Sequence, residues 1–300
     1  MQHRNLLNDS LLLTTAAIWG MAFVAQRIGM EYIGPFTYNG IRFLLGAVTL
    51  VPVLWWKGSN RPVAATRRST GWKDGLVAGL VLFMAASLQQ VGLVYTTAGN
   101  AGFITGLYVV LVPLIGLGRR QRVGRRRWLA VLLAVAGIYL LSVRDGLRVN
   151  PGDLYVIGSA FFFALHVQVI DTVSRRSSAL LLSVAQYAVV GVLSLLVGML
   201  REPLSLPGLG AALPAILYGG IGSISLAYTL QTVAQRRAEP SHAAILLSLE
   251  GAFAALGGWL ILGEVLAGRG LLGSLLLLSG MLLSQTGARR AVHSRPAGSG

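Results

Sequence analysis

Long apolar runs separated by short polar or basic segments dominate this chain. In one of them, residues 75–118, 44 consecutive residues include no Asp, Glu, Lys or Arg. A helix needs ~20 apolar residues to cross a ~30 Å hydrocarbon core, so this run predicts two membrane-spanning helices joined by a turn. The same criterion predicts ten spans in all. They lie at residues 9–28, 36–56, 74–95, 99–118, 127–143, 153–171, 178–199, 210–233, 241–262 and 270–287.

Composition agrees with a membrane protein. Hydrophobic residues make up 54% of the 300 residues and charged residues 12%, about half of the ~25% usual in soluble domains. We therefore expect an all-α polytopic membrane protein. The chain has no cysteine, and its four histidines lack metal-ligand spacing, so we expect no metal and no cofactor.

The net charge of +15 comes from basic clusters between the apolar runs, which excludes nucleic acid as the partner. If the chain crosses the membrane ten times, the segments on one side carry 19 Lys and Arg residues and the segments on the other side carry five. The positive-inside rule places the richer side in the cytoplasm, with both termini and a tail at residues 289–300. We expect these clusters to set the topology in a bacterial inner membrane and to contact anionic lipid.

The two halves of the chain resemble each other weakly. A shift of 142–144 residues superposes Trp19 on Phe163, Phe43 on Tyr187 and Tyr108 on Glu250. Five spans are an odd number, so a second copy must be inverted in the membrane. We therefore predict two inverted five-helix repeats, residues 1–148 and 149–288, with a binding site between them near the midplane.

Several short motifs occur in a characteristic order. They are Ile18-Trp19-Gly20, Arg42-Phe43, the glycine-rich segment 98–108, Ser248-Leu249-Glu250 and Leu262-Gly263-Glu264. In order and spacing the chain resembles the EamA-type permeases of the drug/metabolite transporter superfamily from about residue 11 to 283. The resemblance implies ten helices around a central cavity, with the fifth and tenth outermost, and transport of amino acids, other metabolites or drugs. Gly251 stands where family members usually carry Pro.

Two charged residues inside predicted spans are the strongest candidates for a binding site. Glu250 is the tenth of 22 residues in the ninth span, where a charge costs ~2.5–3.5 kcal/mol on insertion scales. Glu250 must therefore be paired or protonated. Either it binds a substrate amine or a proton, or it forms a hydrogen bond between helices. Arg42 in the second span can bind a carboxylate or serve as a structural partner, and Asn39 precedes it on the same helix face.

Aromatic and polar residues complete the predicted cavity lining. Trp19 and Phe23 share one helical stripe, and Phe163 and His166 share another, each equally compatible with helix packing. The other candidates are Gln90, Phe103, Tyr108 and Tyr228.

We expect a secondary transporter or exporter of small metabolites that works by alternating access around a midplane cavity. Apolar or aromatic amino acids are the preferred substrates, and a proton is a possible coupling ion. The alternatives are a carrier of drugs or other metabolites and a passive channel. A membrane-embedded enzyme is the least favoured class, because the chain has no HExxH, no GxSxG and no paired carboxylates. The oligomeric state does not follow from the sequence.

Overall fold

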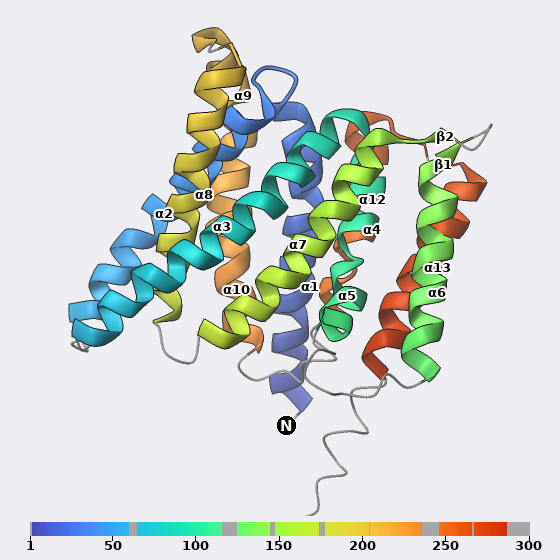
Figure 1. Ribbon diagram of the computed structural model, residues 1–300, viewed down its shortest axis with the longest axis horizontal. Helices are drawn as coiled ribbons and strands as arrows, with labels where there is room; N and C mark the ends of the chain where they lie inside the picture. Colours follow the sequence, from blue (N-terminus) through green and yellow to red (C-terminus); the bar gives the residue numbers. More distant parts are fainter. Residues whose placement is uncertain are drawn as a thin grey trace, which may run out of the picture.

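The computed structural model describes residues 2–59, 65–115, 125–144, 148–173, 178–203, 205–235, 246–265 and 267–286. Almost all of them are helical (Figure 1). The helices are α1 (Gln2–Gly29), α2 (Pro35–Ser59), α3 (Ala65–Tyr95), α4 (Ala98–Thr105), α5 (Tyr108–Ile115), α6 (Arg125–Ser142), α7 (Pro151–Val173), α8 (Ala179–Arg201), α9 (Leu206–Leu217), the π-helix η3 (Tyr218–Ala227), α10 (Tyr228–Gln235), α12 (Glu250–Leu262) and α13 (Gly268–Thr286). Between α6 and α7 two short strands, β1 (Val143–Arg144) and β2 (Arg148–Val149), pair antiparallel.

Six helical segments of the described residues are long and apolar enough to cross a membrane, which confirms a polytopic, largely α-helical membrane protein. They are Leu6–Gly29, Pro35–Trp56, Gly71–Tyr95, Pro151–Ile170, Leu180–Arg201 and Leu206–Gln231. The other four predicted spans correspond to apolar helices of 10–17 residues: Ala98–Val112, Trp128–Ser142, Glu250–Leu262 and Gly268–Ser284. Ten crossings therefore stay a prediction.

Exposed Tyr and Trp side chains mark two ends of the molecule, whereas the exposed Phe161 lies in the middle of α7. At the upper end in Figure 1, where the turn between α1 and α2 and the β1–β2 hairpin lie, the exposed aromatics are Tyr32, Tyr95, Tyr139, Tyr155 and Trp259. At the opposite, lower end they are Trp55, Trp56, Trp72 and Trp128. Tyr and Trp favour the interface between hydrocarbon and water, so the two groups correspond to the two membrane surfaces.

Two predicted spans are interrupted rather than continuous. In the fourth, α4 ends at Thr105 and α5 starts at Tyr108. In the ninth, a turn at residues 248–249 precedes α12, so Glu250 is the first residue of that helix and not an interior one as predicted. Non-helical backbone at membrane depth is tolerated where protein surrounds it.

The described helices form two bundles and a separate pair. In the first bundle, α1 packs against α9, η3, α10 and α12, and η3 also packs against α2. In the second bundle, α3 packs against α7 and α8, and α7 against α4 and α5. The bundles meet along α2–α8 and α4–α12, while α6 packs on α13 at one side (Figure 1). Each bundle combines helices from residues 1–148 with helices from residues 149–288, so the two halves of the chain interdigitate.

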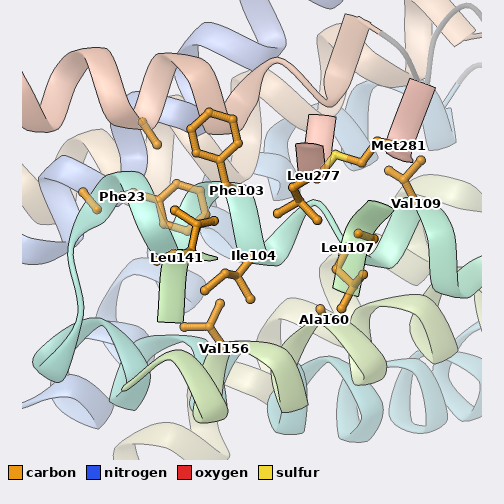
Figure 2. Close-up of a cluster of buried hydrophobic side chains, with 14 of the residues drawn as sticks. Phe23, Phe103, Ile104, Leu107, Val109, Leu141, Val156, Ala160, Leu277 and Met281 are labelled. Carbon is orange, nitrogen blue, oxygen red and sulfur yellow. The ribbon is translucent and has the colours of Figure 1, made fainter. Parts of the chain in front are cut away.

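A cluster of buried apolar side chains joins the α6–α13 pair to both bundles (Figure 2). Phe23 comes from α1, Phe103 from α4, Leu141 from α6 and Leu277 from α13. Complementary packing is the main attraction between helices in lipid, so this cluster fixes where the outer pair lies.

The α6–α13 crossing depends on glycine. A Cβ atom at Gly137 would lie 2.7 Å from both the Gly273 oxygen and the Leu277 nitrogen. We therefore expect Gly137→Ala to force the two backbones apart and cost about 1–3 kcal/mol, the usual effect of overpacking. Thermal unfolding of the purified protein in detergent measures this. Gly210→Ala in α9 is the control, because a Cβ atom there meets nothing within 4 Å. Equal stability of the two variants would contradict close packing at Gly137.

Candidate functional site

The two interrupted spans place Tyr108 and Glu250 in equivalent positions. Tyr108 is the first residue of α5 and Glu250 is the first residue of α12. Equivalent backbone hydrogen bonds surround the two breaks. At the first, Leu107 N donates to Ile104 O (3.0 Å) and Leu111 N donates to Leu107 O (3.0 Å). At the second, Leu249 N donates to Leu246 O (3.3 Å) and Phe253 N donates to Leu249 O (3.0 Å). The 13 residues of α12 span ~20 Å, so Glu250 lies deep inside a ~30 Å hydrocarbon core.

Glu250 is a buried carboxyl group without a hydrogen-bond partner among the described residues. Its side chain is 5% exposed. Tyr108 and Tyr228 lie within electrostatic range of it. The neighbouring backbone of α1 approaches closely, since a Cβ atom at Gly20 would lie 2.6 Å from the Glu250 carbonyl oxygen. An ionised carboxylate here requires a cation, and no cationic side chain of the described part supplies it.

Arg42 is the second buried ionisable group, 3% exposed. Its Nε donates to Asn39 Oδ1 at 2.9 Å, and an Nη2 hydrogen is directed to Gln90 Oε1 at 3.3 Å. The guanidinium carbon also lies 5.0 Å from the centre of the Phe43 ring. No carboxylate of the described residues lies within ion-pair distance of Arg42. The amide nitrogens of Asn39 and Gln90 are buried without a partner, so this corner contains more hydrogen-bond donors than acceptors.

Aromatic rings lie near the two charges. Tyr228 is within electrostatic range of both Arg42 and Glu250. Its ring centre is 4.9 Å from that of Trp19 and 5.7 Å from that of Tyr187. The indole of Trp19 donates to the Ser223 carbonyl oxygen at 3.2 Å, which joins α1 to the π-helix η3. Segments of π-helix are rare and often occur at functional sites.

Three of the remaining predicted residues lie in apolar clusters that border this group: Phe103 packs against Gly251, next to Glu250, and Phe163 packs against the cluster that Tyr228 also contacts. Phe163 packs beside the cluster that contains Phe43 and Tyr187. Phe23 and Phe103 lie in the apolar cluster of Figure 2, exposed by 4% and 6%. His166 Nε2 is 2.7 Å from Gln186 Oε1, in a contact between α7 and α8. The polar site therefore unites Trp19, Asn39, Arg42, Gln90, Tyr108, Tyr228 and Glu250.

Two carboxylates at the upper end, for which sequence reasoning predicted no binding role, bind helix N-termini across the bundle interface. Glu202, after α8, accepts hydrogen bonds from Phe36 N (2.7 Å) and Thr37 N (2.8 Å) at the start of α2. Glu264, after α12, accepts from Ala98 N (2.8 Å) and Gly99 N (3.2 Å) at the start of α4. Each carboxylate satisfies two N–H groups that have no partner within their helix. We call Glu202 and Glu264 the carboxylate caps.

Arg27 forms a third connection between the bundles at the upper end. Its Nη1 donates to Leu93 O at 2.7 Å and to Thr96 O at 2.9 Å, at the end of α3. Helix C-termini carry carbonyl oxygens without partners, which a cation suits.

Comparison with known proteins identifies the family. The EamA-like transporter family matches twice, over residues 6–143 and 150–286, so the chain belongs to this family of membrane transporters. An uncharacterized transporter of Archaeoglobus fulgidus is 32% identical over 283 residues, which cover 93% of this chain and 86% of the relative. The uncharacterized transporter YoaV of Bacillus subtilis is 20% identical, covering 94% and 98% of the two chains. A solved crystal structure, 20% identical, superposes with a TM-score of 0.64 over 95% of this chain and 98% of that chain, and so shares the fold.

The absence of a carboxylate beside Arg42 leads to a prediction about stability. Removing one member of a buried ion pair costs about 3–5 kcal/mol, because the other charge is left alone. Arg42→Gln removes two hydrogen bonds and leaves no described carboxylate unpaired, so we expect a loss of at most about 2 kcal/mol. Thermal unfolding in detergent measures this loss of stability. Arg27→Gln serves as the comparison, because it removes the hydrogen bonds from Arg27 to the end of α3. A loss above about 3 kcal/mol for Arg42→Gln would contradict an unpaired guanidinium.

Proposed function

We propose that this protein is a secondary transporter that exports small zwitterionic metabolites, with apolar or aromatic amino acids preferred. One observation carries the proposal: two buried groups of opposite charge, Arg42 and Glu250, each lack an ionic partner among the described residues, and both lie within electrostatic range of Tyr228. A substrate carboxylate suits the donors of Arg42, Asn39 and Gln90. A substrate amine suits Glu250, and an apolar side chain suits the rings of Trp19 and Tyr187.

The same geometry supports a proton as the coupling ion. Without substrate, an ionised Glu250 would be an uncompensated charge at membrane depth, so the carboxyl group takes up a proton. An arriving amine replaces this proton as the compensating positive charge. Alternation of proton and amine at Glu250 couples export of substrate to entry of a proton.

We further propose ten crossings arranged as two inverted repeats. The double family match and the equivalent breaks before Tyr108 and Glu250 support this arrangement. Packing supports it as well: α1 contacts the α9–η3–α10 segment and α12, and its equivalent α7 contacts α3 and the α4–α5 segment. Phe43 and Tyr187 occupy equivalent positions, and their ring centres are 5.9 Å apart, as expected beside a pseudo-twofold axis.

The bundles, rather than the repeats, are the moving units in this proposal. Each extensive interface within a bundle joins helices from both repeats, so rocking of one repeat against the other would break all of them. Rocking of one bundle against the other alters mainly the α2–α8 and α4–α12 interfaces. The two carboxylate caps and Arg27 all cross between the bundles at the upper end, which supports a state closed at that end.

The lower end faces the cytoplasm in this proposal. The richer set of Lys and Arg residues and both termini belong to that end by the positive-inside rule. The exposed tryptophans Trp55, Trp56, Trp72 and Trp128 fall at the same end. In alternating access, an exporter takes its substrate from the cytoplasm in a state that is closed at the outer, upper end.

Replacement of Glu250 tests the function. Glu250→Gln keeps the size of the side chain and removes both charge and titration. We expect normal folding and at least a tenfold loss of amino-acid counterflow in proteoliposomes, because the amine loses a charged partner worth about 1.5–3 kcal/mol. A substrate analogue without the amine should lose little, since its carboxylate still reaches Arg42.

Glu31→Gln, the same change at an exposed turn residue, is the matched control and should transport normally. Near-normal counterflow in Glu250→Gln, with only a lower melting temperature, would show a purely structural role and remove Glu250 from the site. Failure of every amino acid in wild-type protein would instead favour drugs or other metabolites as substrates.

A further inference from the structure

Three buried polar side chains meet where α2 of the first bundle contacts α3 of the second. Asn39 and Arg42 belong to α2, and Gln90 belongs to α3. Their exposed fractions are 0%, 3% and 1%. Both amides accept from Arg42 through their oxygens, at 2.9 and 3.3 Å, and both amide nitrogens are buried without a partner among the described residues. We call these three side chains the donor corner.

The donor corner has more N–H groups than its own oxygens can accept. A guanidinium has five N–H donors. Arg42 uses its Nε hydrogen on Asn39 Oδ1 and one Nη2 hydrogen on Gln90 Oε1. Its Nη1 donates to no described residue, and the two amide nitrogens add further donors. Because both amide oxygens already accept from Arg42, the remaining donors need an acceptor that a ligand supplies.

The charge of Arg42 determines what kind of acceptor is needed. The rings of Tyr38 and Phe43 lie 5.7 and 5.0 Å from the guanidinium carbon, and such contacts offset only part of the desolvation of a buried ion. An arginine side chain does not lose its proton in proteins. The carboxyl group of Glu250 can be neutralised by a proton, whereas Arg42 can be neutralised only by an anion.

Charge and burial together favour a small monovalent anion. A single negative charge balances Arg42, and a second one would leave an uncompensated charge at membrane depth. Since all three side chains are almost fully buried, a small ion suits the donor corner better than a bulky one. A spherical ion also accepts N–H groups from any direction. Chloride has these properties and is abundant in biological media.

We propose that the donor corner binds one chloride ion whenever no substrate carboxylate is present. The ion accepts from the free N–H groups of Arg42, Asn39 and Gln90. An arriving substrate carboxylate replaces it, just as the substrate amine replaces the proton at Glu250, so the charge of the site is the same with and without substrate. This exchange rests on the proposed function, whereas the chloride site itself does not.

Thermal unfolding of the whole chain in detergent tests the site. Chloride replaces the bulky sulfonate HEPES at constant ionic strength, with no amino acid present. We expect a saturable rise of several degrees in the melting temperature of the wild type, because a ligand that binds only the folded state stabilises it by mass action. Arg201→Gln, which removes an exposed arginine at the end of α8, is the control and should keep the full rise.

Two substitutions in the donor corner should abolish the rise for different reasons. Arg42→Gln removes the charge that needs an anion, so its melting temperature should be the same in both buffers. Gln90→Glu, of nearly the same size, gives Arg42 a carboxylate of its own. It should melt higher than the chloride-free wild type and gain nothing from chloride. This second variant retains the buried contact to Arg42 and tests the site even if Arg42→Gln does not fold.

The chloride site is wrong if the wild type melts at the same temperature in both buffers, or if either corner variant keeps the wild-type rise. Competition tests the exchange: phenylalanine should increase the chloride concentration that gives half the rise, and phenethylamine, which lacks the carboxylate, should not. Equal effects of the two compounds would overturn the exchange. Loss of amino-acid counterflow with the chloride-dependent rise intact would contradict only the exporter proposal, and the reverse result would contradict only the chloride site.

Discussion

The hydrocarbon core contains no water, so every polar group placed there needs a partner supplied by the protein or by a ligand. Most features of this structure follow from that constraint. Long helices satisfy their own backbone, and the two helix breaks before Tyr108 and Glu250 lie inside the protein. Helix ends near the upper surface are satisfied by Glu202, Glu264 and Arg27. Arg42 and Glu250, which lack an ionic partner among the described residues, are the groups to which we assign the substrate.

The hydropathy pattern was sufficient to predict the membrane class and the position of the helices, because the free energy of transferring a long apolar segment into lipid controls both. Intramembrane polarity also singled out Arg42, Asn39, Gln90 and Glu250 as candidates, and the structure joins the first three by hydrogen bonds. The break before Glu250 did not follow, since Gly251 rather than a proline follows Glu250 and glycine is compatible with a helix.

Other features depend on tertiary contacts that periodicity does not contain. Trp19 and Phe23 lie on one stripe of α1, yet Trp19 contacts Tyr228 while Phe23 lies in the apolar cluster. A helical face indicates burial and does not distinguish a packed core from a binding site. Glu202 resembled an ordinary polar residue after a span, because its partners at the start of α2 are 165 residues or more away in sequence. Interdigitation of the two halves into mixed bundles is likewise a property of packing alone.

The central claim is that two bundles move about the buried site and that the carboxylate caps hold the upper end closed. The chain contains no cysteine, so paired labels can be introduced without background. Spin labels at Tyr32 and Tyr95 report the separation of the bundles at the upper end, and labels at Trp55 and Trp72 report it at the lower end. In the double variant Glu202→Gln/Glu264→Gln, the account predicts that the upper distance lengthens by several ångströms while the lower distance shortens. Unchanged distances, or lengthening at both ends, would contradict it.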